Sequence, residues 1–451
     1  MKIIGGTGLP RLDSVQLGWP LLAFSLGAAA VAGLIAGGLP AWRALGRDPA
    51  DELKAGSRTA SIGRTERRWL GGVAALQIAL TLALLVGAGL LIKTVNSLAR
   101  VRPGYDTQNV LTLSVTSMGT NWMDFHRQAI ERVSRLPGVK AAAFGWGIPL
   151  TGNKWHNSFE IDGRIETGAL KDKVRLPTRS ITPDYISALS LTLVEGRAFR
   201  SSDDDDAPRV VLVNQAMVDR YFPGGTAVGR RLRFEGSTNR VEIVGVLANA
   251  RTDALTDAAE PELYYCFWQA AAFSKHLVLR TQGDPRPMAG LVERELRAIE
   301  PTAAVEHVKT LEEIRSESVA ARTFAMRLLI GFALVACVLA AVGIYGVLSL
   351  AVGSRQTEIA IRMAVGAQRH DVLRLMLADG LRLALAGIAI GVLVAIALSA
   401  GLKTFLFGVA PGDPWILCGM ALVVMALTVL TCWIPARRAT RVDPLTALRA
   451  E

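Results

Sequence analysis

The stretch LLIGFALVACVLAAVGIYGVLSLAVGS, from Leu328 to Ser354, decides the fold of this chain. It contains no Asp, Glu, Lys or Arg, and it exceeds the about 20 apolar residues that cross a bilayer as a helix. Four further stretches are also uncharged and long enough, namely Ser14–Trp42, Trp69–Ile92, Leu383–Leu402 and Pro414–Ala436. A soluble protein with five buried helices is the alternative, and the number and length of the stretches argue against it. The sequence therefore predicts an α-helical membrane protein with about five transmembrane helices.

Basic residues gather in certain loops and orient the chain. The formal net charge of the chain is +11. Seven Lys or Arg residues lie between the first and second stretches, and five lie between the third and fourth. Only Lys403 lies between the fourth and fifth. The positive-inside rule then places those two basic loops and the C-terminal tail in the cytoplasm, and the long segment 101–320 outside. Because this topology accounts for the basic excess, nucleic acid is not an expected partner.

Two segments of the chain are near copies of each other. PAWRALGRDPADELKAG starts at Pro40 and PARRATRVDPLTALRAE starts at Pro435, and their first sixteen positions share eight identities. The first apolar stretch with its tail thus corresponds to the fifth stretch with its own tail. We expect residues 1–62 to be the last transmembrane helix and cytoplasmic tail of a truncated first module, followed by one complete module.

The complete module divides into three expected parts. Residues 63–100 supply its first transmembrane helix, residues 101–320 a large extracytoplasmic domain, and residues 321–451 a domain with three transmembrane helices. In the middle part, alternating or buried strand patterns begin at Val110, Arg209, Arg240 and Ala303, and helical patterns begin at Phe125, Asn214 and Pro285. Strands and helices alternate, which predicts an α+β domain of βαβ-type units.

The sequence shows no recognisable motif for catalysis or for metal binding. The phosphate-binding motif G-x-x-x-x-G-K-[ST] is missing, so the chain is not expected to hydrolyse ATP. Cys266 stands alone in the expected outer domain, which excludes a disulfide there, and the five histidines are scattered. The run SSDDDD, ending at Asp206, lacks the ligand spacing of a calcium loop and is interpreted as a solvated charge run. We expect no cofactor.

One loop segment is a candidate for transmitting motion, and two glycine pairs are candidates for close helix packing. The segment SRQTEIAIRMAVGAQRHDVLRLMLADGLRLALAG starts at Ser354, and Glu358 and Arg362 lie one helical turn apart in it in the favourable order. Gly366 is predicted to end a short helix, and a second helix to start at about His370 and run into the fourth apolar stretch. A partner could push such a short helix, and an interfacial amphipathic helix without a partner is the alternative. In the fourth stretch, Gly387-x-x-x-Gly391 allows close approach of another helix, as does Gly33-x-x-x-Gly37 in the first.

The loop resembles the signature of the FtsX-like/MacB-like permeases of ATP-binding cassette (ABC) transporters. The pattern Glu-Ile-x-Ile-Arg-x-x-x-Gly-Ala is matched by Glu358, Ile359, Ile361, Arg362, Gly366 and Ala367. Segments from Ile181, Val211 and Val241 resemble a MacB-like periplasmic core domain, and the closing PARRATRVDPLTALRAE also fits the family. The internal repeat resembles the subfamily of tandem double permeases, here with the first module almost wholly missing.

The resemblance implies a function and partners. It implies a permease subunit of the inner (cell) membrane, multi-pass, with its large domain extracytoplasmic and its C-terminus cytoplasmic. A separate ABC ATPase subunit dimer would push the six matched residues, and the motion would reach the outer domain and drive export or release of a substrate. Further implied partners are membrane lipid, a periplasmic adaptor, and a second permease module or a copy of the chain itself. The alternatives are an FtsX-type signalling permease that activates an extracytoplasmic partner such as a cell-wall hydrolase, or a non-functional fragment.

Overall fold

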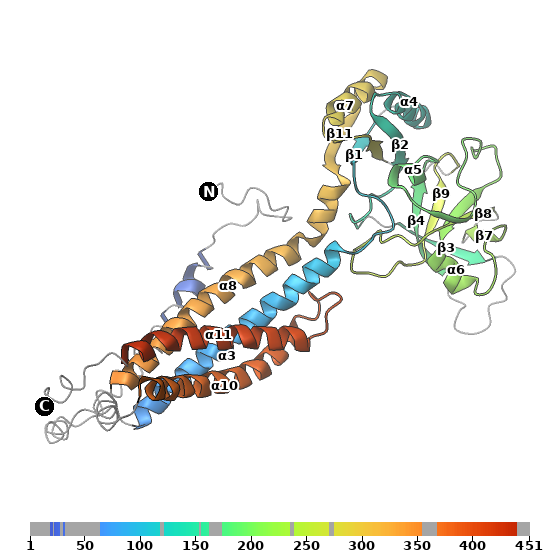
Figure 1. The fold of residues 1–451 in the computed structure, drawn as a ribbon. Coiled ribbons are helices and arrows are strands. Elements are labelled where there is room, and N and C mark those ends of the chain that lie inside the picture. The colour runs from blue at the N-terminus through green and yellow to red at the C-terminus, as the bar shows by residue number, and fades with distance from the viewer. Residues whose placement is uncertain are drawn as a thin grey trace. The chain divides into compact units, whose positions relative to one another are not determined.

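The computed structural model divides into two units, which are described separately. It describes residues 19–20, 22–27, 30–31, 64–117, 121–152, 155–161, 174–234, 239–269, 275–353 and 368–439. The helical unit comprises Met1–Ser97 with Arg322–Glu451, and the α+β unit comprises Leu98–Ala321. Most of the helices and strands are labelled in Figure 1.

Among the described residues, four long apolar helices belong to the helical unit, and Figure 1 labels them. They are α3 (Arg64–Ala99), α8 (Leu311–Gly353), α10 (Arg369–Gly401) and α11 (Pro414–Ala439). Each holds a segment that is long and apolar enough to cross a membrane: Trp69–Ala99, Leu311–Leu350, Leu373–Gly401 and Pro414–Ile434. Four of the predicted transmembrane helices are thereby confirmed. The first predicted one, Ser14–Trp42, falls almost wholly outside the described residues.

Helix α3 is the central helix of this unit. In its most apolar window 61% of the residues are buried, against 17% in α8, 28% in α10 and 17% in α11. Ile78, Leu82, Val86 and Leu90 recur every four residues along α3 and are almost fully buried, because that spacing keeps them on one helical face. The outer helices instead expose large apolar side chains such as Leu334 and Val338, as expected for surfaces that meet lipid tails.

In its described residues, the α+β unit contains an eleven-stranded sheet and four shorter helices. The strands are β1 (Val110–Thr116), β2 (Val139–Gly145), β3 (Trp155–Ile161), β4 (Val174–Ile181), β5 (Leu193–Gly196), β6 (Val210–Asn214), β7 (Arg231–Phe234), β8 (Arg240–Leu247), β9 (Leu263–Cys266), β10 (His276–Thr281) and β11 (Ala304–Thr310). The helices are α4 (Trp122–Ser134), α5 (Tyr185–Leu189), α6 (Gln215–Tyr221) and α7 (Met288–Ile299). The strand order is β11-β1-β10-β2-β4-β3-β7-β8-β6-β9, and β5 pairs with β8. Every strand and helix predicted from the sequence in this unit is confirmed.

The predicted strand–helix–strand units are present, mostly in a split form. Strands β1 and β2 flank α4 in sequence, but β10 lies between them and pairs antiparallel with both. Likewise β10 and β11 flank α7, and β1 lies between them. By contrast, β6 pairs directly with β8 in parallel after the chain passes through α6. Each split unit thus needs a strand from far along the chain to complete it.

Separate hydrophobic cores lie on the two faces at the β1–β10–β2 end of the sheet. Phe125, Ala129 and Val133 of α4 pack with Val292 and Leu296 of α7 on one face, where they also meet β1, β2 and β10. The helical spacing of these residues explains why both segments form amphipathic helices. The opposite face is covered by α5 and the loops around it. A further core lies under α6.

The interpretation of the acidic run as solvated is wrong for its first aspartate. The Asp203 side chain is 8% exposed and accepts hydrogen bonds from Nη1 and Nη2 of Arg197 at 2.7 and 3.0 Å. It also accepts one from the Arg200 backbone N–H at 2.8 Å. A buried carboxylate needs such partners. Arg197 supplies the positive charge, and it lies outside the acidic run. Asp205 and Asp206 are exposed as predicted.

Candidate functional site

The six residues matched to the coupling motif fall between two described helices. Helix α8 ends at Gly353, and α10 begins at Arg369 after its N-cap residue Gln368. Glu358, Ile359, Ile361, Arg362, Gly366 and Ala367 therefore lie outside the described residues, and their role stays a prediction. What the structure does describe are the helices that begin and end at this segment and the contacts that hold them.

The start of α10 has a defined entry geometry. The backbone N–H of Gln368 donates to Asp371 Oδ2 at 3.0 Å, and the backbone N–H of Asp371 donates to the Gln368 carbonyl at 3.0 Å. The Asp371 carboxylate also lies in the first turn, where the helix dipole favours negative charge. These contacts fix the backbone at the start of α10. They confirm the predicted helix start near His370, and the Gln-x-x-Asp spacing is a signal that the sequence reasoning missed.

Glycines let α10 lie directly against α3. A Cβ atom added at Gly387 would lie 2.7 Å from Cβ of Ile78 and 2.9 Å from the carbonyl oxygen of Ala75. One added at Gly391 would lie 3.0 Å from Cα of Ala79. The backbones therefore approach as closely as only glycine permits, which confirms the prediction made from Gly387-x-x-x-Gly391.

Helix α8 meets α3 through small and polar groups. The Thr81 hydroxyl of α3 lies 2.8 Å from the Gln77 carbonyl in its own helix and 3.2 Å from the Ala336 carbonyl of α8. Gly343 of α8 faces the Gln77 side chain so closely that a Cβ there would overlap it. Interhelical contacts of this kind hold helices together in lipid, where apolar surfaces give no net drive for association.

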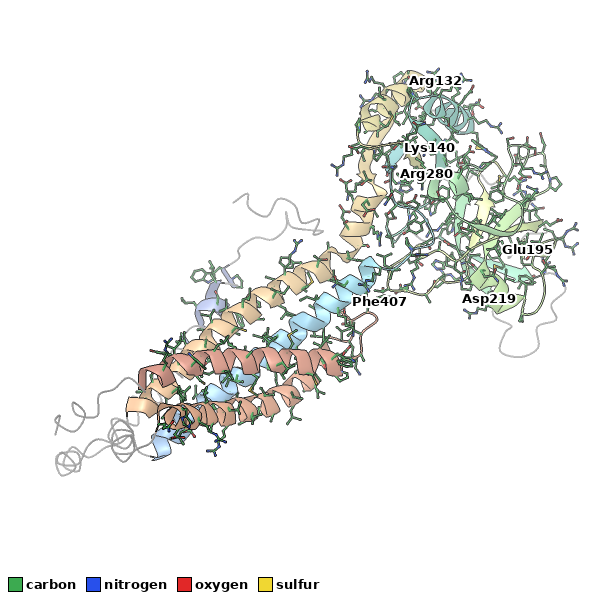
Figure 2. The ribbon with its side chains drawn as sticks, viewed as in Figure 1. Arg132, Lys140, Glu195, Asp219, Arg280 and Phe407 are labelled. Atoms are coloured by element: carbon green, nitrogen blue, oxygen red, sulfur yellow. The ribbon has the colours of Figure 1, made fainter. Side chains whose placement is uncertain are left out.

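The C-terminal end of α3 is joined to the loop between α10 and α11. Lys93 forms an ion pair with Asp413, the residue before α11. The backbone N–H of Phe407, labelled in Figure 2, donates to Thr94 Oγ1 at 3.4 Å. The hydrogen bond from Lys93 lowers the pKa of Asp413 below its usual value, which favours the ionised carboxylate.

In the α+β unit, the first turn of α8 is built into the hydrophobic core. Leu311 is fully buried and Ile314 is 6% exposed, and both belong to the core that contains α5. The Thr310 backbone N–H donates to Glu313 Oε2 at 2.8 Å, and the Glu313 N–H donates to Thr310 Oγ1 at 3.1 Å. This reciprocal pair is a capping box. It explains why the helix starts at Leu311, well before the uncharged stretch that predicted it.

The end of α3 and the segment after it are also anchored. Arg315 Nη2, in the second turn of α8, donates to the Ala99 carbonyl at 2.9 Å and so caps α3. Arg280 of β10 (Figure 2) holds Asp106 by a 2.8 Å bond to Oδ2 and a 3.1 Å bond to the carbonyl oxygen. Burial acts to raise the pKa of Asp106, but the hydrogen bonds from the Gln108 N–H and from Arg280 outweigh it, so the pKa is lowered.

A buried ionic network also lies in the α+β unit. Arg179 and Glu262 form an ion pair with both side chains 4% exposed, and the Tyr264 hydroxyl donates to Glu262 Oε2 at 2.6 Å. Burial raises the pKa of the neighbouring Tyr185 to about 12. Arg179 also donates to the Gly147 carbonyl at 3.3 Å. These groups satisfy one another inside the sheet, which is the arrangement of a structural ion pair. In the described part of the chain, no group of three or more His, Cys, Asp or Glu residues is arranged to hold a metal ion.

Comparison with known families gives two matches that together cover most of the described helices and strands. Residues 72–306 match the MacB-like periplasmic core domain, and residues 330–444 match the FtsX-like permease C-terminal domain. The first match covers more than half of the chain.

Several curated relatives are similar at low identity. The pyoverdine export ATP-binding/permease protein PvdT of Pseudomonas entomophila is 25% identical over 57% of this chain and 40% of its own. The uncharacterized ABC transporter permease YvrN of Bacillus subtilis is 26% identical over 60% of this chain and 69% of its own. The macrolide export ATP-binding/permease protein MacB of Salmonella choleraesuis is 23% identical over 82% of this chain and 58% of its own. The chain thus spans about two fifths of the pyoverdine export protein and less than two thirds of the macrolide one.

A solved structure is also similar. The periplasmic region of MacB from Actinobacillus actinomycetemcomitans covers 49% of this chain and 96% of its own, with 11% identity and a TM-score of 0.34.

Proposed function

Since the chain belongs to the ABC transporter permeases that combine an FtsX-like permease domain with a MacB-like periplasmic core domain, we propose that it couples a separate ATPase to the export or release of a substrate. The coupling is mechanical. ATP binding in an ATPase subunit dimer moves the segment between α8 and α10, and the long helices carry that motion to the outer domain.

The observation that carries this proposal is the continuity of α8. It is one helix of 43 residues from Leu311 to Gly353, about 65 Å long, while the hydrocarbon core of a bilayer is about 30 Å thick. Its first turn belongs to the core of the α+β unit, and its last residue directly precedes the coupling segment. A displacement of its C-terminal end would therefore act on the domain core without an intervening loop.

The anchors at the other connection support the same mechanism. Arg315 caps the end of α3, and Arg280 holds Asp106 in the segment that follows. Both ends of the α+β unit are thus held by hydrogen bonds within that unit. The names of the pyoverdine and macrolide relatives describe them as export proteins. For this chain, export is part of the proposal.

Orientation, partners and subfamily complete the proposal. The basic loops favour a multi-pass protein of the inner membrane with the α+β unit outside and the C-terminus in the cytoplasm. Glu358, Ile359, Ile361, Arg362, Gly366 and Ala367 would meet the ATPase. A second permease module or a copy of the chain would face the helical unit, and a periplasmic adaptor would meet the outer domain. The repeat of the Pro40 and Pro435 segments favours the tandem subfamily.

Stimulation of the cognate ATPase tests the coupling role. Glu358→Lys, with Arg362 kept, places like charges one helical turn apart and reverses the charge offered to the partner. We expect membrane insertion to be unchanged and stimulation of the co-purified ATPase to fall. Glu306→Lys is the matched control, because Glu306 lies on β11 with its side chain 62% exposed. Equal stimulation by wild type and by both variants would reject the coupling role of the segment.

A further inference from the structure

A cavity of about 400 Å³ lies among α3, α8 and α10 of the helical unit. Its lining includes Gly71, Gly72, Ala75, Val347, Asp379 and Arg382. Gly71, Gly72 and Ala75 line it from α3, and Val347 lines it from α8. Asp379 and Arg382, one helical turn apart, line it from α10. Mixed chemistry of this kind, apolar on one side and charged on the other, suits an amphiphilic ligand.

The position of the cavity across the bilayer follows from the charge-free stretches on two helices. Arg382 immediately precedes Leu383–Leu402, whose 20 residues rise about 30 Å and so fill the hydrocarbon thickness. On α3, Trp69 begins the uncharged stretch and is 49% exposed, as is usual for aromatic residues at a membrane interface. Gly71 and Gly72 follow within one turn. Both helices therefore place the cavity at the boundary between headgroups and acyl chains.

The charged wall can bind a phosphate. The Arg382 side chain is 81% exposed, and its Nη1 lies 3.6 Å from Asp379 Oδ1, which is an ion-pair separation longer than a hydrogen bond. A guanidinium carries five N–H donors in a fork that matches phosphate oxygens. Asp379 lies beside it with a carboxylate that has about four lone-pair sites, and so can accept from an ammonium in addition to its protein contacts.

The glycine wall leaves room for an acyl chain. A Cβ added at Gly72 would meet nothing within 4 Å, and one added at Gly71 would meet only Leu383 Cδ1 at 3.9 Å. This differs from Gly387 and Gly391, whose missing side chains are required by helix contact. At Gly71 and Gly72 the space is open, and at this depth it borders lipid.

We propose that the cavity binds one zwitterionic phospholipid with a primary ammonium headgroup. The phosphate lies on Arg382, the ammonium lies on Asp379, and the upper part of one acyl chain lies along Gly71, Gly72 and Val347. The paired opposite charges of α10 match the paired charges of such a headgroup, whereas a purely anionic headgroup would place its charge beside Asp379. The proposal stands independently of the transport function.

Native mass spectrometry of the purified full chain tests the site, with dioleoylphosphatidylethanolamine as the probe. We expect a single-lipid adduct with wild type and an affinity about tenfold weaker for Arg382→Gln, which removes a charge-assisted contact. Arg374→Gln is the matched control, because Arg374 is an exposed arginine of the same helix that does not line the cavity. It should bind as wild type does.

A second pair of variants tests the site without changing charge. Gly72→Leu fills the cavity and should abolish the single adduct, while Gly331→Leu places the same side chain in open space on α8 and should not. Circular dichroism confirms that each variant is folded. Equal binding by wild type, Arg382→Gln and Gly72→Leu would overturn the proposal. So would binding of dioleoylphosphatidylglycerol as tightly as the ethanolamine lipid, since the proposed match depends on the ammonium.

Discussion

Replacing Gly387 by alanine tests whether α10 packs on α3 as the structure has it. The added Cβ would lie 2.7 Å from both Cβ and Cγ2 of Ile78 and 2.9 Å from the Ala75 carbonyl oxygen. Ile78 is fully buried and the carbonyl belongs to the helix backbone, so neither group can move aside without shifting α3. Overpacking of this kind costs about 1–3 kcal/mol.

Alanine also favours the helix relative to glycine by about 0.8–1 kcal/mol, which would hide part of that cost. Gly419→Ala on α11 provides the same gain without the clash, because a Cβ there would meet nothing within 4 Å. We therefore expect the free energy of unfolding of Gly387→Ala to be about 1–3 kcal/mol below that of Gly419→Ala. Equilibrium unfolding of both variants in mixed detergent micelles measures the difference. Equal stability would refute the close α3–α10 contact.

Two further predictions concern the anchor at Asp106 and the topology of the chain. The Asp106 pKa is lowered in the folded protein, so its bond to Arg280 should stabilise the α+β unit above the unfolded pKa of about 3.9 and lose that effect as the pH falls below it. The excess stability of wild type over Asp106→Asn should accordingly shrink between about pH 5 and pH 3 in chemical denaturation, and a constant excess would contradict the assignment. Reporter fusions at Arg58 and Arg369 should read cytoplasmic and a fusion at Asp205 should read outside, whereas an outside signal at Arg369 would reverse the orientation.

The elements that local sequence could predict are those set by charge and periodicity. Uncharged stretches predicted four helices of the helical unit, and Gly387 and Gly391 predicted where α10 approaches another helix. Residue patterns also predicted β1, α4 and α7 close to their observed bounds. In each case the determining residues lie within a few turns of one another, so the pattern is complete within one segment.

The rest depends on partners that are distant in sequence. Arg280 and Asp106 are 174 positions apart, and nothing near either residue indicates that they pair. The same holds for the sheet order, since β10 lies between β1 and β2 in the sheet but follows β3 to β9 in the chain. Buried Asp203 was missed because its partner Arg197 lies before the acidic run and not within it. The Thr310-x-x-Glu313 capping box was readable in the sequence and would have placed the start of α8.

Interrupting α8 tests the central claim most directly, because the claim requires an unbroken helix between the coupling segment and the domain core. Four glycines inserted after Val319 should leave stimulation of the cognate ATPase intact and abolish export or release of its substrate. Four alanines inserted at the same place add about one helical turn and keep the helix rigid, so they should preserve a substantial part of the transport. Full transport by the glycine variant would contradict mechanical transmission through α8.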